Sequence, residues 1–98
     1  MNMKIDVRAL VNGSLAGEDL MTHVASIAAE MSSEELLALI KECDEYGAEL
    51  NEKSQAIIRK NKEAGIPMFM YSDEDDAAFE EMSWNIARLR CVRLGLKK

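Results

Sequence analysis

Several residue types that often mark chemistry or irregular backbone are scarce in this sequence. Its 98 residues include one proline, one histidine and two cysteines, and only 5% are aromatic. The single histidine, His23, is followed by Ser26 and Ile27 at the next positions on its helix face, so that face carries no second metal ligand. A glycine-rich phosphate loop is also missing, because Gly13 and Gly17 do not follow a predicted strand. We therefore expect no enzyme, no metal ion and no cofactor.

The cysteines and the lack of long apolar runs bear on location. Cys43 and Cys91 stand at unrelated spacing with no secretory leader, which is typical of reduced, buried thiols in the cytosol. A dyad of either thiol with His23 stays open, although neither cysteine lies where a thiolate would be stabilised. No apolar run approaches the ~20 residues of a membrane span. We expect a soluble, cytoplasmic protein without membrane contact.

Apolar and charged residues are both plentiful. With 48% apolar and 31% charged residues, residues 1–98 should form one folded domain. The net charge of -6 does not favour nonspecific attraction to nucleic acid or to an anionic membrane. The four consecutive acids from Asp73 to Asp76 indicate a helix start rather than a calcium loop, which needs alternating ligands and a central glycine.

The stretch from Ser32 to Gly65 predicts one long helix over residues 33–64. Ser32 and Glu35 form a capping box, Gly65 offers a left-handed cap, and Pro67 prevents continuation of the helix. Residues at alternating intervals of four and three lie on one face of this helix, and that face can pack along a neighbouring helix. This face comprises Leu36, Ile40, Cys43, Gly47, Leu50, Ser54, Ile57 and Asn61.

The predicted helix is long for a chain of this size. About 31 residues at ~1.5 Å each span roughly 46 Å, whereas a compact chain of about 100 residues has a radius of gyration near ~13 Å. The molecule is elongated, or the helix breaks near Gly47, or a partner covers the projecting part. Gly47, Ser54 and Asn61 bury little apolar area, which weakens a self-contained core along that row.

Three further helices complete an all-α prediction. Residues 6–12 favour a short helix capped by Asp6, although their alternation also suits a strand. Residues 17–31 form a helix whose apolar face should pack against the long helix, because the junction between them is short. Ser72 or Asp73 caps the last helix, residues 73–94. We expect short N-terminal helices packed on an antiparallel hairpin of two long helices.

The charges on the two long helices select their orientation. The first is acidic and then basic along its length, and the second also begins acidic and ends basic. An antiparallel arrangement therefore brings opposite signs together, whereas a parallel one would not. Arg88 should lie beside Glu49. Arg93 should lie beside Asp44 or Glu45.

The loop after the long helix, with the sequence GIPMFMYS, is unusually apolar. Its side chains either plug the open end of the helix packing or form an exposed partner-binding surface, since methionine and aromatic residues are enriched at interfaces. The candidate binding residues are Ile66, Pro67, Met68, Phe69, Met70 and Tyr71. The bond before Pro67 prefers trans by only ~0.5–1 kcal/mol, which makes Pro67 a candidate site for a prolyl isomerase.

Basic residues near the C-terminus supply further candidate contacts. Arg88, Arg90 and Arg93 could form a nucleic-acid patch together with Trp84. Basic residues also suit the C-terminal end of a helix that lies beside an acidic one. Direct contact with nucleic acid is therefore not our expectation, and we assign these arginines to the binding of a protein partner.

A family resemblance rests on four features of the whole chain. These are its length, its acidic helical character, its lack of catalytic motifs and the lone proline of Gly65-Ile66-Pro67-Met68 after a long helix. In these the chain resembles the small bacteriophage accessory proteins of the P22 type that act against RecBCD. The resemblance implies a protein of the host cytoplasm that binds RecBCD, through RecC, and alters its nuclease and recombination activity so that phage DNA survives.

We therefore predict a noncatalytic protein that binds and modulates a host DNA-processing enzyme. The loop of residues 66–71 and a charged helical face would make the contacts. Two alternatives come from other classes of protein. One is a small nucleic-acid-binding regulator that uses the basic C-terminal helix, and the other is a structural protein that self-associates through the face of the long helix.

Overall fold

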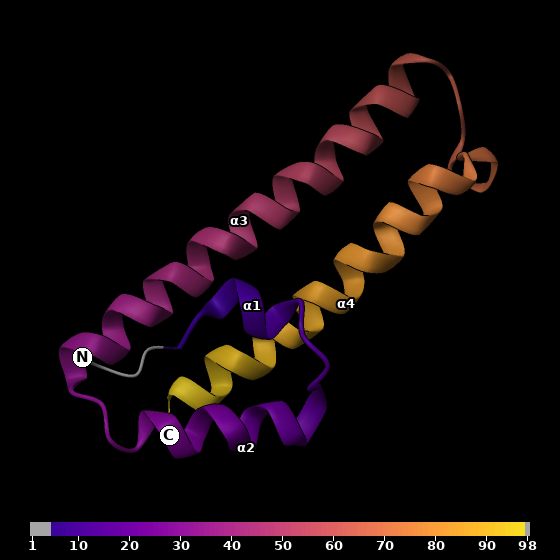
Figure 1. Cartoon of the computed structure of the whole chain (residues 1–98). Helices are drawn as coiled ribbons and strands as arrows, with labels where there is room; N and C mark the ends of the chain where they lie inside the picture. The colour runs from indigo at the N-terminus through magenta and orange to yellow at the C-terminus, as the bar shows by residue number, and fades with distance from the viewer. Residues whose placement is uncertain (1–4, 98) are drawn as a thin grey trace.

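The computed structural model describes residues 5–97, and these contain helices and connecting turns but no strand. The all-α prediction is confirmed (Figure 1). The elements in chain order are α1 (Val7–Val11), α2 (Gly17–Ala28), α3 (Ser33–Glu63), the 3-10 turn η1 (Met68–Met70) and α4 (Asp73–Leu96). Helix α1 forms where the sequence also allowed a strand, and the Asp6 side chain caps it by accepting a hydrogen bond from the Ala9 amide at 3.1 Å. Residues 1–4 of that ambiguous segment lie outside the described residues.

Two long helices form the frame of the molecule. Helices α3 and α4 run antiparallel as a hairpin (Figure 1). We call the half with the start of α3 and the end of α4 the basal half, and the half with the connecting turn the distal half. Helices α1 and α2 pack on the basal half. Helix α2 packs chiefly on α4, so the prediction that it packs on the long helix is wrong. Helix α2 packs on α4 because the two backbones can approach closely at Gly95, which has no side chain. A Cβ atom on Gly95 of α4 would lie 2.9 Å from the Met21 carbonyl oxygen and 2.8 Å from the Val24 Cβ of α2.

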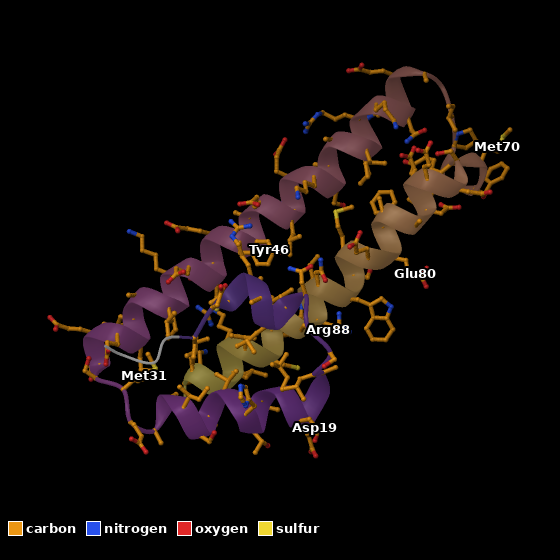
Figure 2. All side chains as sticks on the ribbon, viewed as in Figure 1. Asp19, Met31, Tyr46, Met70, Glu80 and Arg88 are labelled. Carbon is orange, nitrogen blue, oxygen red and sulfur yellow. The ribbon has the colours of Figure 1, made fainter. Side chains whose placement is uncertain are left out.

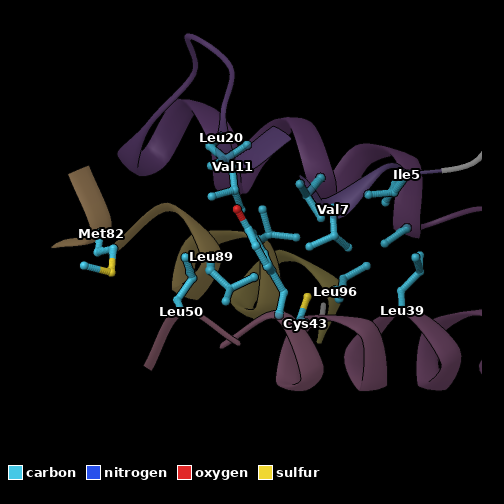
Figure 3. Packing of buried hydrophobic residues seen from close by; sticks show 14 residues of the cluster. Ile5, Val7, Val11, Leu20, Leu39, Cys43, Leu50, Met82, Leu89 and Leu96 are labelled. Atoms are coloured by element: carbon cyan, nitrogen blue, oxygen red, sulfur yellow. The ribbon is translucent and has the colours of Figure 1, made fainter. Parts of the chain in front are cut away.

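The hydrophobic core lies at the basal end, where all four helices meet (Figure 3). Leu20, Val24, Val11 and Leu96 are at most 1% exposed and form its centre. Among the described residues, no buried apolar side chain comes from α3 beyond Leu50 or from α4 before Met82. The distal half of the hairpin is held instead by half-buried apolar contacts and by polar groups.

The ends of α3 follow the sequence signals. Ser32 Oγ accepts from the Glu35 amide at 3.2 Å, and Glu35 accepts in return from the Ser32 amide at 2.9 Å. At the other end Gly65 has a φ of +74°. The Ile66 amide donates to the Asn61 carbonyl oxygen at 2.9 Å, which closes a Schellman motif. Both predicted caps of this helix are confirmed.

The molecule is elongated. Its radius of gyration is 16.0 Å and its principal extents are 51 × 23 × 21 Å. Helix α3 continues unbroken through Gly47, where a Cβ would meet the Leu89 Cδ2 atom at 3.4 Å. The predicted alternative of an elongated molecule is therefore confirmed, and a break near Gly47 does not occur.

One of the two predicted cross-hairpin ion pairs forms. Arg93 Nε donates to Asp44 Oδ1 at 2.9 Å, as expected for antiparallel helices. The predicted pairing of Arg88 with Glu49 is wrong, because Glu49 accepts two hydrogen bonds from Arg8 at 2.6 and 2.9 Å. Helix α1 lies in the groove between the long helices and supplies the arginine that satisfies Glu49. Arg88 instead donates a long hydrogen bond to the Val11 carbonyl oxygen at 3.5 Å.

Candidate protein-docking site

A buried polar cluster closes the distal end of the hairpin. Asp75, at the start of α4, accepts from the Asn61 amide at 3.0 Å and from Lys60 Nζ at 3.1 Å. Asp75 and Asn61 are only 8% and 3% exposed. The hydrogen bond from Asn61 and then that from Lys60 lower the pKa of Asp75, so its carboxylate is charged at neutral pH. These contacts fix the two helix ends that flank the connecting turn.

The turn itself is ordered by short-range hydrogen bonds. The Met70 amide donates to the Pro67 carbonyl oxygen at 2.9 Å, and the Tyr71 amide donates to that of Met68 at 3.2 Å. The Ile66–Pro67 bond is trans. The Ser72 side chain accepts from the Asp75 amide at 3.1 Å and caps α4. Our sequence reasoning predicted a loop here and missed η1, which is too short for a helical periodicity to reveal.

Large apolar side chains project from this turn into solvent. Phe69 is 88% exposed, Met68 71%, Met70 63% and Ile66 38%. The interpretation of the loop as an internal plug is therefore wrong for these four residues. Tyr71 alone folds inward and stacks on Phe79 of α4, with ring centroids 5.9 Å apart. We call Ile66, Met68, Phe69 and Met70 the apolar tip.

Acidic side chains surround the apolar tip. Glu63 before it and Asp73, Glu74 and Asp76 after it are all exposed. Lys60 and Lys62 are exposed basic residues of this end, and Lys60 is paired with Asp75. The exposed charge next to the apolar side chains is therefore mainly negative.

The three candidate arginines do not join the apolar tip. Figure 2 shows Met70 at the end of the hairpin, and Arg88 well away from it, near α1. Arg88 and Arg93 are half-buried, and Arg93 is held by Asp44, so only Arg90 of the three is exposed. The structure thus separates the predicted contacts into a distal apolar set and a basal basic set, and the basal set offers one free guanidinium rather than a patch.

The remaining candidate groups of the sequence analysis are the cysteines and the single histidine. Burial raises the pKa of the Cys43 thiol to about 11, so it is protonated at neutral pH and a poor nucleophile. His23 is exposed on α2. Within residues 5–97 no three His, Cys, Asp or Glu side chains are grouped closely enough to hold a metal ion.

Two open hollows flank the helices without suggesting chemistry. One of about 480 Å³ lies between the residues that precede α1 and the first turns of α3, and it is lined by Met31, Leu39 and several carboxylates. Another of about 460 Å³ follows the groove between α3 and α4, beyond Asn12 at the end of α1. Both are wide shallow clefts rather than enclosed pockets for a small ligand. The projecting apolar tip is the more specific surface feature.

Comparisons of the chain with protein-family models, with curated proteins and with solved structures find no match. Among the described helices, none has a stretch apolar and long enough to cross a membrane.

Proposed function

We propose that this protein is a noncatalytic binding module whose apolar tip docks into a hydrophobic pocket of a protein partner. The observation that carries the proposal is the exposure of Phe69, Met68 and Met70 on one short, hydrogen-bonded turn. Folded monomers seldom leave contiguous large apolar groups in water, and such groups are enriched at interfaces.

The fixed geometry of the turn favours tight docking. The Schellman motif at Gly65 and the Ser72 cap hold both ends of the turn, so little backbone entropy is lost on binding. Burying one large apolar side chain contributes about 1.5–3 kcal/mol. Phe69, with the largest exposed fraction, should therefore be the energetic centre of the interface.

The partner that we propose is RecBCD, bound through its RecC subunit. This choice rests on the resemblance to phage accessory proteins, and the solvent-exposed, proline-containing turn after a long helix supports it. Binding would alter the nuclease and recombination activity of the host enzyme without any chemistry by the module. Pro67 is exposed in the same turn and is accessible to a prolyl isomerase as a second partner.

The test measures binding of purified RecBCD to the wild type and to two single variants. Phe69→Ser removes the most exposed side chain of the tip, and Leu37→Ser removes a 67% exposed side chain on the first turns of α3. Phe69→Ser should weaken binding by at least about tenfold, because about 1.4 kcal/mol corresponds to that factor. Leu37→Ser should bind as the wild type does.

Both variants should unfold at the wild-type temperature, since each changes an exposed side chain. Equal binding by Phe69→Ser and the wild type would refute the tip as the docking element. Failure of the wild type to bind RecBCD would refute that enzyme as the partner.

A further inference from the structure

Helix α4 carries a second exposed apolar stripe, which shares no residue with the apolar tip. Its residues recur at alternating intervals of three and four, which places them on one helix face like the seam of a coiled coil. The members are Ala77, Glu80, Trp84, Ala87, Cys91 and Leu94, and we call them the α4 seam.

The α4 seam faces solvent while the rest of the helix is covered. Helices α1, α2 and α3 contact other sides of α4, which bury Met82, Leu89 and Val92. Trp84 is nevertheless 57% exposed and Leu94 49%. Ala77, Glu80 and Ala87 are exposed and Cys91 is half-buried. Within the monomer the stripe is covered only in part: the Arg88 guanidinium carbon lies 5.9 Å from the centroid of the Trp84 ring, and Cys91 packs partly against the core.

The order of small and large residues along the α4 seam is self-complementary under a two-fold axis at its centre. If a second copy of α4 lies antiparallel, with a two-fold axis between Trp84 and Ala87, each Trp84 packs over Ala87 of the other copy. The same axis places Leu94 opposite Ala77 of the other copy. Both large apolar side chains, Trp84 and Leu94, then meet an alanine, so the helices can approach closely. Glu80 falls opposite Cys91 and is the one charged residue of the seam.

The charges beside the α4 seam select the same arrangement. The helix begins with exposed Asp73, Asp76 and Glu81, and its last turns carry Arg90 and Lys97. In the antiparallel pair Asp76 lies near Lys97 of the second copy, and Glu81 lies near Arg88. A parallel pair would bring like charges together, which is unfavourable.

We propose that the protein forms a two-fold symmetric homodimer through antiparallel pairing of the α4 seam. The face of α3 that sequence analysis considered for self-association cannot serve, because much of it is buried against α4 within one chain. The residues of the apolar tip are not part of the α4 seam. The proposal is therefore independent of the docking function.

Trp84 offers a direct reporter, because it is the only tryptophan in the chain. Sedimentation velocity and tryptophan emission are measured together over a dilution series from millimolar to low micromolar protein. The wild type should pass from dimer to the 11.0 kDa monomer on dilution, and its emission should shift to longer wavelength as Trp84 becomes exposed. A wild type that stays monomeric at every concentration would overturn the proposal.

Two single variants locate the interface. Ala87→Glu places a carboxylate under Trp84 of the second copy. The carboxylate would lose its water in the dimer without gaining a hydrogen-bond or charge partner, so the variant should weaken dimerisation by at least about tenfold. Ala87 is exposed in the monomer, so the variant should fold. Phe69→Ser, which alters only the apolar tip, should dimerise as the wild type does. Unchanged dimerisation of Ala87→Glu, or loss of it in Phe69→Ser, would overturn the assignment to the α4 seam.

A charge exchange tests the antiparallel direction. Asp76→Lys should weaken the dimer, because two lysines then face each other across the pair. Adding Lys97→Glu to that variant should restore dimerisation, since the opposite signs return with their positions exchanged. Both residues are exposed, and circular dichroism checks that α4 remains helical. If the double variant dimerises no better than Asp76→Lys, the antiparallel register is wrong.

Discussion

Gly95 determines how closely α2 approaches α4. A Cβ at this position would lie within 3 Å of both a backbone oxygen and a buried valine, neither of which can move freely. We predict that Gly95→Ala lowers the free energy of unfolding by about 1–3 kcal/mol through overpacking, as measured by urea denaturation.

Gly47 supplies the matched control for that substitution. It lies inside α3, and its added Cβ would touch only the flexible end of Leu89 at 3.4 Å. Gly47→Ala should therefore leave stability unchanged or raise it by up to about 1 kcal/mol through helix propensity. Equal destabilisation by the two alanine substitutions would contradict the close helix contact at Gly95.

Asp75 makes the distal end of the hairpin sensitive to acid. Hydrogen bonds from Asn61 and Lys60 lower its pKa below the ordinary value of 3.8, so the unfolded chain binds this proton more readily than the folded one. The stabilisation is therefore present above pH 4 and is lost as the pH falls through the lowered pKa. We predict that wild-type stability falls more steeply between pH 5 and pH 2 than that of Asp75→Asn, as followed by urea titrations. Parallel pH profiles would contradict this role.

The start of α3 depends on the capping box. Ser32 accepts from the Glu35 amide, and its loss leaves an amide of the first turn unsatisfied. We predict that Ser32→Ala lowers the free energy of unfolding by about 1 kcal/mol. Ser33→Ala, one residue later at an exposed helical position, should change it by less than about 0.5 kcal/mol. Similar losses in thermal denaturation of the two variants would contradict the cap.

The helix ends show which boundaries a sequence can reveal. Serine caps mark where α3 and α4 begin, and Gly65 marks the end of α3. Helix α2 ends at Ala28, whereas the sequence predicted an end at residue 31. The prediction ran too far because no glycine or proline marks the end of the helix and apolar residues continue beyond it. Helix α4 runs to Leu96 rather than residue 94, because Gly95 does not end the helix but lies within it, buried against α2.

The partners of each element were harder to predict than its bounds. The pairing of Arg93 with Asp44 follows from register along two antiparallel helices. The pairing of Glu49 with Arg8 does not, because it depends on α1 entering the groove between those helices. The packing of α2 on α4 likewise depends on the space left at Gly95, which no periodicity shows.

The distribution of the core over the whole molecule predicts uneven local stability. Buried apolar side chains gather at the basal end, while the distal half of the hairpin projects from it (Figure 1). Segments with few buried contacts open locally at lower cost than core segments. We predict faster amide hydrogen exchange for α3 beyond Leu50 than for its first half. Uniform protection along α3, measured by mass spectrometry, would contradict this distribution.

The sequence shows where the candidate docking site lies in the chain, but not whether its side chains point into the protein or into solvent. The apolar composition of residues 66–71 marks an unusual loop. Whether these side chains point inward depends on where α1 and α2 end along the hairpin, which is a property of the assembled fold. Tyr71 turns inward and Phe69 outward, although both are aromatic residues of one short turn.

The docking of the apolar tip is the central claim, and oxidation footprinting of methionines tests it most directly. Met68 and Met70 are 71% and 63% exposed, whereas Met82 is 8% exposed and serves as the internal control. In the free protein Met68 and Met70 should oxidise rapidly and Met82 slowly. In the complex with purified RecBCD, oxidation of Met68 and Met70 should fall toward the rate of Met82. Oxidation of both at the free-protein rate in that complex would contradict the account.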